Sequence, residues 1–219
     1  MKNVSCAVAA IALVSAASGL AQAQDGVVLD YTKRSFRDAQ PAVAAADKTR
    51  VTSALASAPS DAVKALGKNL VVLGHAKGKS AKAGDVDFFL LSEKPPVAAE
   101  PVPKAASQVI VALKGKDVVG TYVLPAERQY ARLVGAVDMD GDNASEVLLE
   151  GAGYNMGQLI LVLDAVKLEA NGTTRVAQSI PEVFSDSCQG AVAKKTRSAK
   201  TISLRGGKLV ETVHPEKCG

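Results

Sequence analysis

From Leu70 onward, short apolar runs alternate with polar turns, which is the pattern of β-strands rather than of helices. Gly206-Gly207 and Asn171-Gly172 each separate two such runs by two residues, the spacing of a tight hairpin whose turn residues tolerate positive φ. Lys114-Gly115-Lys116-Asp117 predicts a third hairpin. The runs are residues 70–73, 86–91, 109–113, 118–124, 130–137, 146–151, 159–168, 173–180, 201–205 and 208–213. This succession of short strands predicts a mainly β, antiparallel domain over residues 70–219.

Residues 24–69 have a different pattern, rich in Ala and charged residues and poor in β-branched clusters. Good helix formers dominate residues 42–56, and Pro41 suits the first turn of a helix. Ser60 resembles an N-cap and Gly67 a stop signal for a second, short helix. We expect a short helical N-terminal segment here; the alternative is a loosely ordered arm.

Residues 95–103 contain four prolines, which predicts an extended, polyproline-like connector. Strands are expected on both sides of it. The connector is therefore either a linker between domains or a long surface loop within one domain.

The first 23 residues read as a signal peptide rather than as part of the fold. Lys2 provides a positive start, residues 8–17 are apolar and uncharged, and Ala21-Gln22-Ala23 forms a small-x-small cleavage site before Gln24. No later segment has the length needed to span a bilayer. We therefore expect a periplasmic or secreted protein without a membrane span.

Composition adds two constraints. The chain of 219 residues has no Trp and only 4% aromatic residues, so its core must rest on Val, Leu, Ile and Ala. Cys188 and Cys218 remain after removal of the signal peptide, and an oxidising compartment favours a disulfide between them. A zinc site that uses His214 and Cys218 is the alternative, since imidazole and thiolate are zinc ligands.

The densest chemistry in the chain lies in residues 138–146, here called the acidic loop, with sequence Asp-Met-Asp-Gly-Asp-Asn-Ala-Ser-Glu. Its four carboxylates stand at loop positions 1, 3, 5 and 9, between two expected strands. Such crowding requires a cation, hydrogen-bond donors or open water, and calcium prefers all-oxygen ligands of this kind. A plain solvated turn is the simpler alternative. An EF-hand does not fit, because Asn143 stands at position 6, Leu149 stands at position 12, and the flanks are strands.

The spacing Asp-x-Asp-x-Asp with a following acidic residue, entered and left by strands, resembles the calcium loop of FG-GAP and VCBS-type repeats of the integrin-α kind. The resemblance covers about residues 131–163. It implies a structural calcium ion held by the side chains of Asp138, Asp140, Asp142 and Glu146 and by the backbone carbonyl of Ala144. Two residues depart from the pattern: Asn143 replaces a glycine, which Asn tolerates because it visits left-handed conformations, and Glu146 replaces Asp.

A second copy of the repeat can be aligned at residues 79–91, with Asp87 matching Glu146, but Lys79, Ala81 and Ala83 stand where ligands should be. This stretch is either a degenerate repeat without metal or a chance similarity. Because a closed propeller needs about four blades or more, the expected fold is a propeller-like fragment or a sandwich.

Two other motifs give weaker indications of function. Residues 74–80 imitate a phosphate-binding P-loop but are one residue short of its spacing, so we expect no nucleotide. A basic segment near the C-terminus lacks the aromatic residues that stack on bases, which disfavours nucleic acid and leaves a solvated loop or a polyanion partner. Its members are Lys194, Lys195, Arg197, Lys200, Arg205 and Lys208.

The sequence holds no nucleophile elbow and no zinc-hydrolase motif, and only His75 and His214 could serve as a histidine base. We therefore favour an exported, calcium-binding binding or structural module, with an unknown protein or glycan ligand, over an enzyme. The alternatives are a secreted hydrolase with a structural calcium ion, and an adhesin or inhibitor that binds a polyanion.

Overall fold

The structure is a computed structural model that describes residues 26–38, 43–58, 60–67, 70–93 and 106–218. The expected signal peptide and the proline-rich connector lie outside these residues. The described residues form three short helices, α1 (Arg34–Arg37), α2 (Ala45–Ser57) and α3 (Asp61–Lys64), and eleven strands. The strands are β1 (Gly26–Asp30), β2 (Val71–Ser80), β3 (Gly84–Ser92), β4 (Gln108–Lys114), β5 (Asp117–Val123), β6 (Arg132–Val137), β7 (Glu146–Asn155), β8 (Gln158–Leu168), β9 (Thr174–Asp186), β10 (Arg197–Arg205) and β11 (Lys208–Glu216).

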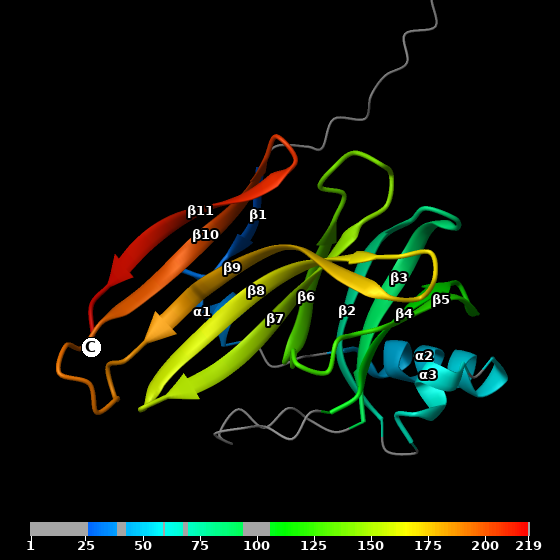
Figure 1. The fold of residues 1–219 in the computed structure, drawn as a ribbon, viewed down its shortest axis with the longest axis horizontal. Helices are drawn as coiled ribbons and strands as arrows, with labels where there is room; N and C mark the ends of the chain where they lie inside the picture. Colours follow the sequence, from blue (N-terminus) through cyan, green and yellow to red (C-terminus); the bar gives the residue numbers. More distant parts are fainter. Residues whose placement is uncertain (1–25, 39–42, 59, 68–69, 94–105, 219) are drawn as a thin grey trace, which may run out of the picture.

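All eleven strands belong to one mixed sheet, so the prediction of a mainly β chain is confirmed. Its order is β1-β10-β9-β8-β7-β6-β2-β3-β4-β5, and β11 also pairs with β10 (Figure 1). Strand β10 pairs with β11 along its whole length, with β9 near its start and with β1 near its end. The pair β2–β6 is parallel, so the prediction of an antiparallel domain is wrong for this pair; the other described pairs are antiparallel.

The sheet curls, so that β3 and β4 face β7 and β8 across a shared core. Phe88, Leu90 and Ile110 from one side pack in the same buried cluster as Val147 and Leu149 from the other. At the rim, the Val123 N–H donates to the Gly172 carbonyl at 3.0 Å, and the Thr174 hydroxyl donates to the Val123 carbonyl at 2.9 Å. The end of β5 therefore reaches the turn between β8 and β9, although the two strands form no ladder.

The expected helices cover the outer face of β3 and β4 (Figure 1). Val51 of α2 and Val63 of α3 are buried against Phe89 and Val111 of the sheet. The Ser60 hydroxyl accepts a hydrogen bond from the Val63 N–H at 3.3 Å, as expected for an N-cap.

The start of the described chain differs from the helical expectation, because residues 26–30 form strand β1. This strand pairs with β10 and buries Leu29 in the C-terminal core. Five residues carry too little periodic pattern to identify a strand locally, so the pairing partner decides the conformation.

Hairpins form at all three predicted positions, but the turn at Asn171-Gly172 is longer than the two residues predicted. Gly206-Gly207, with φ of 52° and 77°, makes a two-residue turn between β10 and β11, and Gly115-Lys116 joins β4 to β5. Asn171-Gly172 lies in a longer connection. The Glu169 N–H donates to the Thr173 carbonyl, and three residues lie between this pair. The Asn171 side chain closes this turn by accepting from the Thr173 N–H at 3.0 Å.

The P-loop-like residues 74–80 lie within strand β2, where two glycines permit close packing. A Cβ at Gly74 would lie 2.7 Å from the backbone nitrogen and oxygen of Leu133, at the one residue pair that joins β2 to β6. A Cβ at Gly78 would lie 2.8 Å from the ring of Phe88 and 2.9 Å from the Ser145 hydroxyl. The two halves of the sheet therefore meet where the chain has no side chain.

Gly74→Ala is expected to lower the free energy of unfolding by about 1–3 kcal/mol, because the obstacle is backbone that cannot rotate away. Gly153→Ala is the matched control: Gly153 also lies in a strand, but no atom lies within 4 Å of its added Cβ. We expect this control to stay within about 0.5 kcal/mol of the parent in urea unfolding. Equal stability of the two variants would mean that the β2–β6 contact is not tight.

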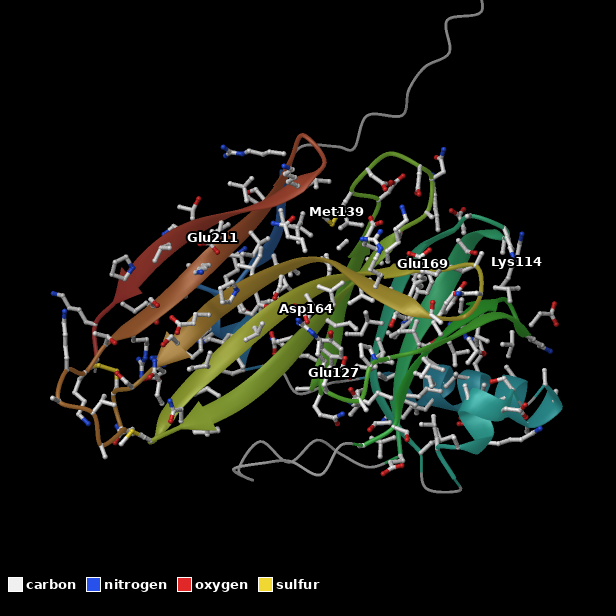
Figure 2. All side chains as sticks on the ribbon, viewed as in Figure 1. Lys114, Glu127, Met139, Asp164, Glu169 and Glu211 are labelled. Atoms are coloured by element: carbon white, nitrogen blue, oxygen red, sulfur yellow. A yellow bond between two sulfur atoms is a disulfide. The ribbon has the colours of Figure 1, made fainter. Side chains whose placement is uncertain are left out.

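The predicted disulfide between Cys188 and Cys218 is present, with the two Cα atoms 5.5 Å apart. It ties the loop after β9 to the end of the chain, at the lower left of Figure 2. Because the Cys218 sulfur is bonded to Cys188, the zinc alternative with His214 does not hold.

Replacing both cysteines with serine is expected to cost roughly 3–4 kcal/mol, since the bridge spans 30 positions and restricts the unfolded chain. Urea unfolding of the oxidised parent, the reduced parent and the double variant tests this. The reduced parent should match the variant; a variant as stable as the oxidised parent would contradict the assigned role.

Candidate metal centre

The acidic loop connects β6 to β7 and is anchored at its two ends. Met139 is 6% exposed and packs into the core cluster beneath the loop (Figure 2). Glu146, the first residue of β7, is 2% exposed. Between them, Gly141 and Asn143 turn the chain with φ of 77° and 64°, so Asn143 takes the left-handed conformation that the sequence led us to expect.

Backbone N–H groups of the loop point at its own carboxylates. Asp138 accepts from Gly141 at 2.8 Å and from Asn143 at 3.0 Å. Asp140 accepts from Asp142 at 3.3 Å, Asp142 accepts from Ala144 at 2.8 Å, and Glu146 accepts from Met139 at 2.9 Å. These bonds wrap the loop around its acidic groups.

Three of the five predicted ligands converge. One oxygen from each of Asp138, Asp140 and Glu146 lies within 4.8 Å of the others, an arrangement able to hold a cation. Asp142 stands outside this triad, and Ala144 is placed by its N–H bond to Asp142. The donor set is all oxygen, which suits a hard divalent cation.

Sequence reasoning missed one member of the site, Lys167 of β8. Its Nζ lies 2.7 Å from Asp140 Oδ2, 2.8 Å from Asp142 Oδ2 and 3.8 Å from Glu146 Oε1. The lysine is thus an internal counter-ion for the loop. The register of β7 and β8 explains why Lys167 lies at this site. Val147 pairs with Val166, so the next position of the antiparallel ladder places Lys167 across from Glu146.

These contacts and burial shift the pKa values of Lys167, Asp140 and Glu146. Hydrogen bonds to Asp140 and then Asp142 raise the pKa of Lys167, and the hydrogen bond from Lys167 lowers the pKa of Asp140. Burial raises the pKa of Glu146. The hydrogen bond from Lys167 thus favours the charged form of Asp140, whereas burial disfavours the charged form of Glu146.

A cation bound at this triad would compete with Lys167. The ammonium is hydrogen-bonded to Asp140, one of the three converging carboxylates, and a dication and an ammonium a few ångströms apart repel each other. The site holds four carboxyl groups and one lysine, so exchange of the ammonium for a dication is electrostatically reasonable.

A cavity of about 160 Å³ borders the loop. Its wall comprises the end of β2 and the following turn, β5, residues 144–146 and the end of β8 with the turn that follows. Glu146 and Lys167 belong to both the loop cluster and the cavity wall. Tyr122, half-buried in that wall, has its pKa raised by burial.

The other chemical candidates lie elsewhere. His75 Nε2 lies 2.7 Å from Asp87 Oδ1, and its ring stacks on Phe89 at 4.6 Å. His214 shares a hydrogen bond of 3.0 Å with Thr201. Neither histidine is among the described residues that line the cavity.

The basic segment is partly engaged by internal contacts. Lys195 donates to the Gly190 carbonyl, Arg197 pairs with Asp186 at 2.8 Å, and Lys200 pairs with Glu211 at 2.8 Å. These bonds reduce the positive charge available to a polyanion.

Comparisons with protein-family models, with curated proteins and with solved structures find no match to this chain. Within the described part of the chain, no helix has both the length and the apolar character needed to cross a membrane. Function must therefore be argued from the site itself.

Lys167→Met should destabilise the metal-free protein by roughly 0.5–1 kcal/mol at low ionic strength, because the carboxylates lose their counter-ion. Lys116→Met, in the exposed turn between β4 and β5, removes the same charge away from the loop and should have little effect. Thermal unfolding in EDTA at 20 mM and 500 mM NaCl tests this, with the difference shrinking at high salt.

The same difference should depend on pH. Asp140 has a pKa below its ordinary 3.8, so its contribution is complete above that pH and is lost as the pH falls through the folded value. The raised pKa of Lys167 keeps its contribution complete up to its ordinary 10.5. Parent and variant should therefore differ between about pH 5 and 9 and converge in acid; a difference independent of both salt and pH would contradict an electrostatic role.

Proposed function

We propose that this protein is an exported, β-rich binding or structural module whose acidic loop takes a structural calcium ion. The observation that carries the proposal is the convergence of Asp138, Asp140 and Glu146 within 4.8 Å, in a loop that resembles the FG-GAP and VCBS-type calcium loop. Asp142 and the Ala144 carbonyl are the further ligands that this resemblance implies.

The ion would replace Lys167 as the positive charge that holds the loop together. Since it must displace an ammonium bonded at 2.7 and 2.8 Å, its net affinity is lower than the carboxylates alone would give. Extracellular calcium modules bind at about 10⁻⁴–10⁻³ M, and we place this loop in that range. At such an affinity, the external calcium concentration would determine whether the loop carboxylates contact calcium or the Lys167 ammonium.

For the fold class, we favour a sandwich-like arrangement over a propeller fragment. Support comes from the buried cluster that β3 and β4 share with β7 and β8, which resembles two layers closing on one core. A propeller blade is instead a separate four-stranded sheet facing a central channel. The FG-GAP and VCBS likeness then concerns the loop and its two flanking strands alone.

Export is inferred from the N-terminal sequence pattern and agrees with a bridged cysteine pair. Within this proposal the ligand is a protein or glycan. A secreted hydrolase gains no support from the described residues, because the cavity beside the loop has no histidine in its described wall. A polyanion-binding adhesin is weakened by the internal pairing of Arg197 and Lys200.

Millimolar calcium should stabilise the mature, oxidised protein. With a Kd of 10⁻⁴–10⁻³ M, 5 mM calcium contributes about 1–2 kcal/mol, which corresponds to a rise in Tm of roughly 2–8 °C over the EDTA value. Asp138→Ala/Asp140→Ala should abolish the shift, because it removes two of the three converging carboxylates.

The control Asp61→Ala/Asp117→Ala removes the same charge from two positions outside the loop and should retain the shift. Isothermal titration should give one calcium per chain in the parent and in this control. The absence of a shift in the parent, or an equal shift in the loop variant, would remove the calcium proposal and leave the loop as an acidic turn neutralised by Lys167.

A further inference from the structure

The cavity beside the acidic loop shares two residues with the candidate metal centre, which gives the two sites a direct physical connection. Glu146 and Lys167 line the cavity of about 160 Å³, and Lys167 also bonds the loop carboxylates. The Lys167 side chain is 24% exposed and lines the cavity. Its four side-chain torsions let the ammonium leave the loop without any change in the backbone.

A dication on the loop would leave Lys167 without its partners. The ammonium now contacts Asp140, a member of the converging triad, at 2.7 Å, and Asp142, a further ligand that the resemblance implies, at 2.8 Å. A metal ion at the triad would compete for these carboxylates and would repel the ammonium. The cavity is the space that Lys167 already borders, and turning toward it keeps the aliphatic part of the side chain against the wall. An uncompensated positive charge then faces a partly enclosed space.

The remainder of the wall is suited to a small amphipathic molecule. Phe88, Val119 and Leu168 contribute apolar surface, and Ser80, Thr121 and Tyr122 contribute hydroxyl groups. Lys79 and Lys82 also line the cavity, so its wall is basic even before Lys167 is released. The volume is close to the roughly 150 Å³ of an apolar cavity that admits benzene. An apolar body the size of one aromatic ring, carrying a single anionic group, matches both the space and the charge.

We propose that this cavity is a binding site for a small monocarboxylate with an apolar body, and that calcium on the acidic loop strengthens binding by releasing Lys167 to meet the carboxylate. The inference deepens the proposed function and rests on it, since calcium is the agent that releases the lysine. Coupling is reciprocal, so the carboxylate must tighten calcium binding by the same factor.

Benzoate is the probe, and benzyl alcohol is its uncharged counterpart of similar size. Isothermal titration of each into the mature, oxidised protein, once in EDTA and once in 5 mM calcium, measures the coupling. Benzoate should bind about tenfold or more tightly in calcium, within the usual range of coupling between two sites. Benzyl alcohol should bind equally in both buffers, because it offers Lys167 no charge.

Three variants locate the effect. Lys167→Met should bind calcium more tightly but lose the calcium dependence of benzoate binding. Lys116→Met, with the same change of charge away from the cavity, should keep it. Ala170→Trp fills the cavity from its exposed turn and should abolish benzoate binding in both buffers, while calcium still raises the Tm of this variant.

The outcomes separate the two proposals. If calcium neither binds nor raises the Tm, the proposed function fails and this inference fails with it. If calcium binds but benzoate affinity is the same in both buffers, the inference alone is overturned. It is equally overturned if the calcium effect persists in Lys167→Met, or if benzoate still binds to Ala170→Trp.

Discussion

The two halves of this sheet are joined by a contact that only a glycine permits. At Gly74, the backbone of β2 lies so close to Leu133 of β6 that an added Cβ would be 2.7 Å from main-chain atoms. This single parallel pair lets β3 and β4 share a buried cluster with β7 and β8. Farther along β2, the Ser145 N–H donates to the Lys79 carbonyl at 2.8 Å, which fixes the exit of the acidic loop. The position of the candidate metal centre thus depends on close packing several residues away.

Electrostatics shapes the loop itself. Four carboxylates within nine residues repel one another, and backbone N–H groups compensate only part of that repulsion. Lys167 of β8, the strand that pairs with β7, supplies the missing positive charge. A chain that carries its own counter-ion can fold before any metal ion arrives. If a dication binds as proposed, it must compete with this ammonium, because both would contact the Asp140 carboxylate.

Local sequence was informative wherever the structure depends on neighbours in the chain. The turns at Gly115-Lys116 and Gly206-Gly207, the cap at Ser60 and the left-handed Asn143 follow from backbone preferences of individual residues. It was less informative at Asn171-Gly172, where a side-chain hydrogen bond helps to close a longer turn. It failed for β1, whose five residues become a strand because β10 offers a pairing edge and a buried place for Leu29.

The candidate site also has features that local sequence determines and features that depend on tertiary structure. The sequence alone determined that four carboxylates are concentrated in one short loop between expected strands, and it led us to expect a disulfide between Cys188 and Cys218. Only the tertiary structure decided that Asp138, Asp140 and Glu146 converge while Asp142 turns to Lys167. It also decided that a cavity adjoins them. The physical reason is register: the lysine is 21 positions beyond Glu146 along the chain, and only the antiparallel pairing of β7 with β8 brings the two charges together.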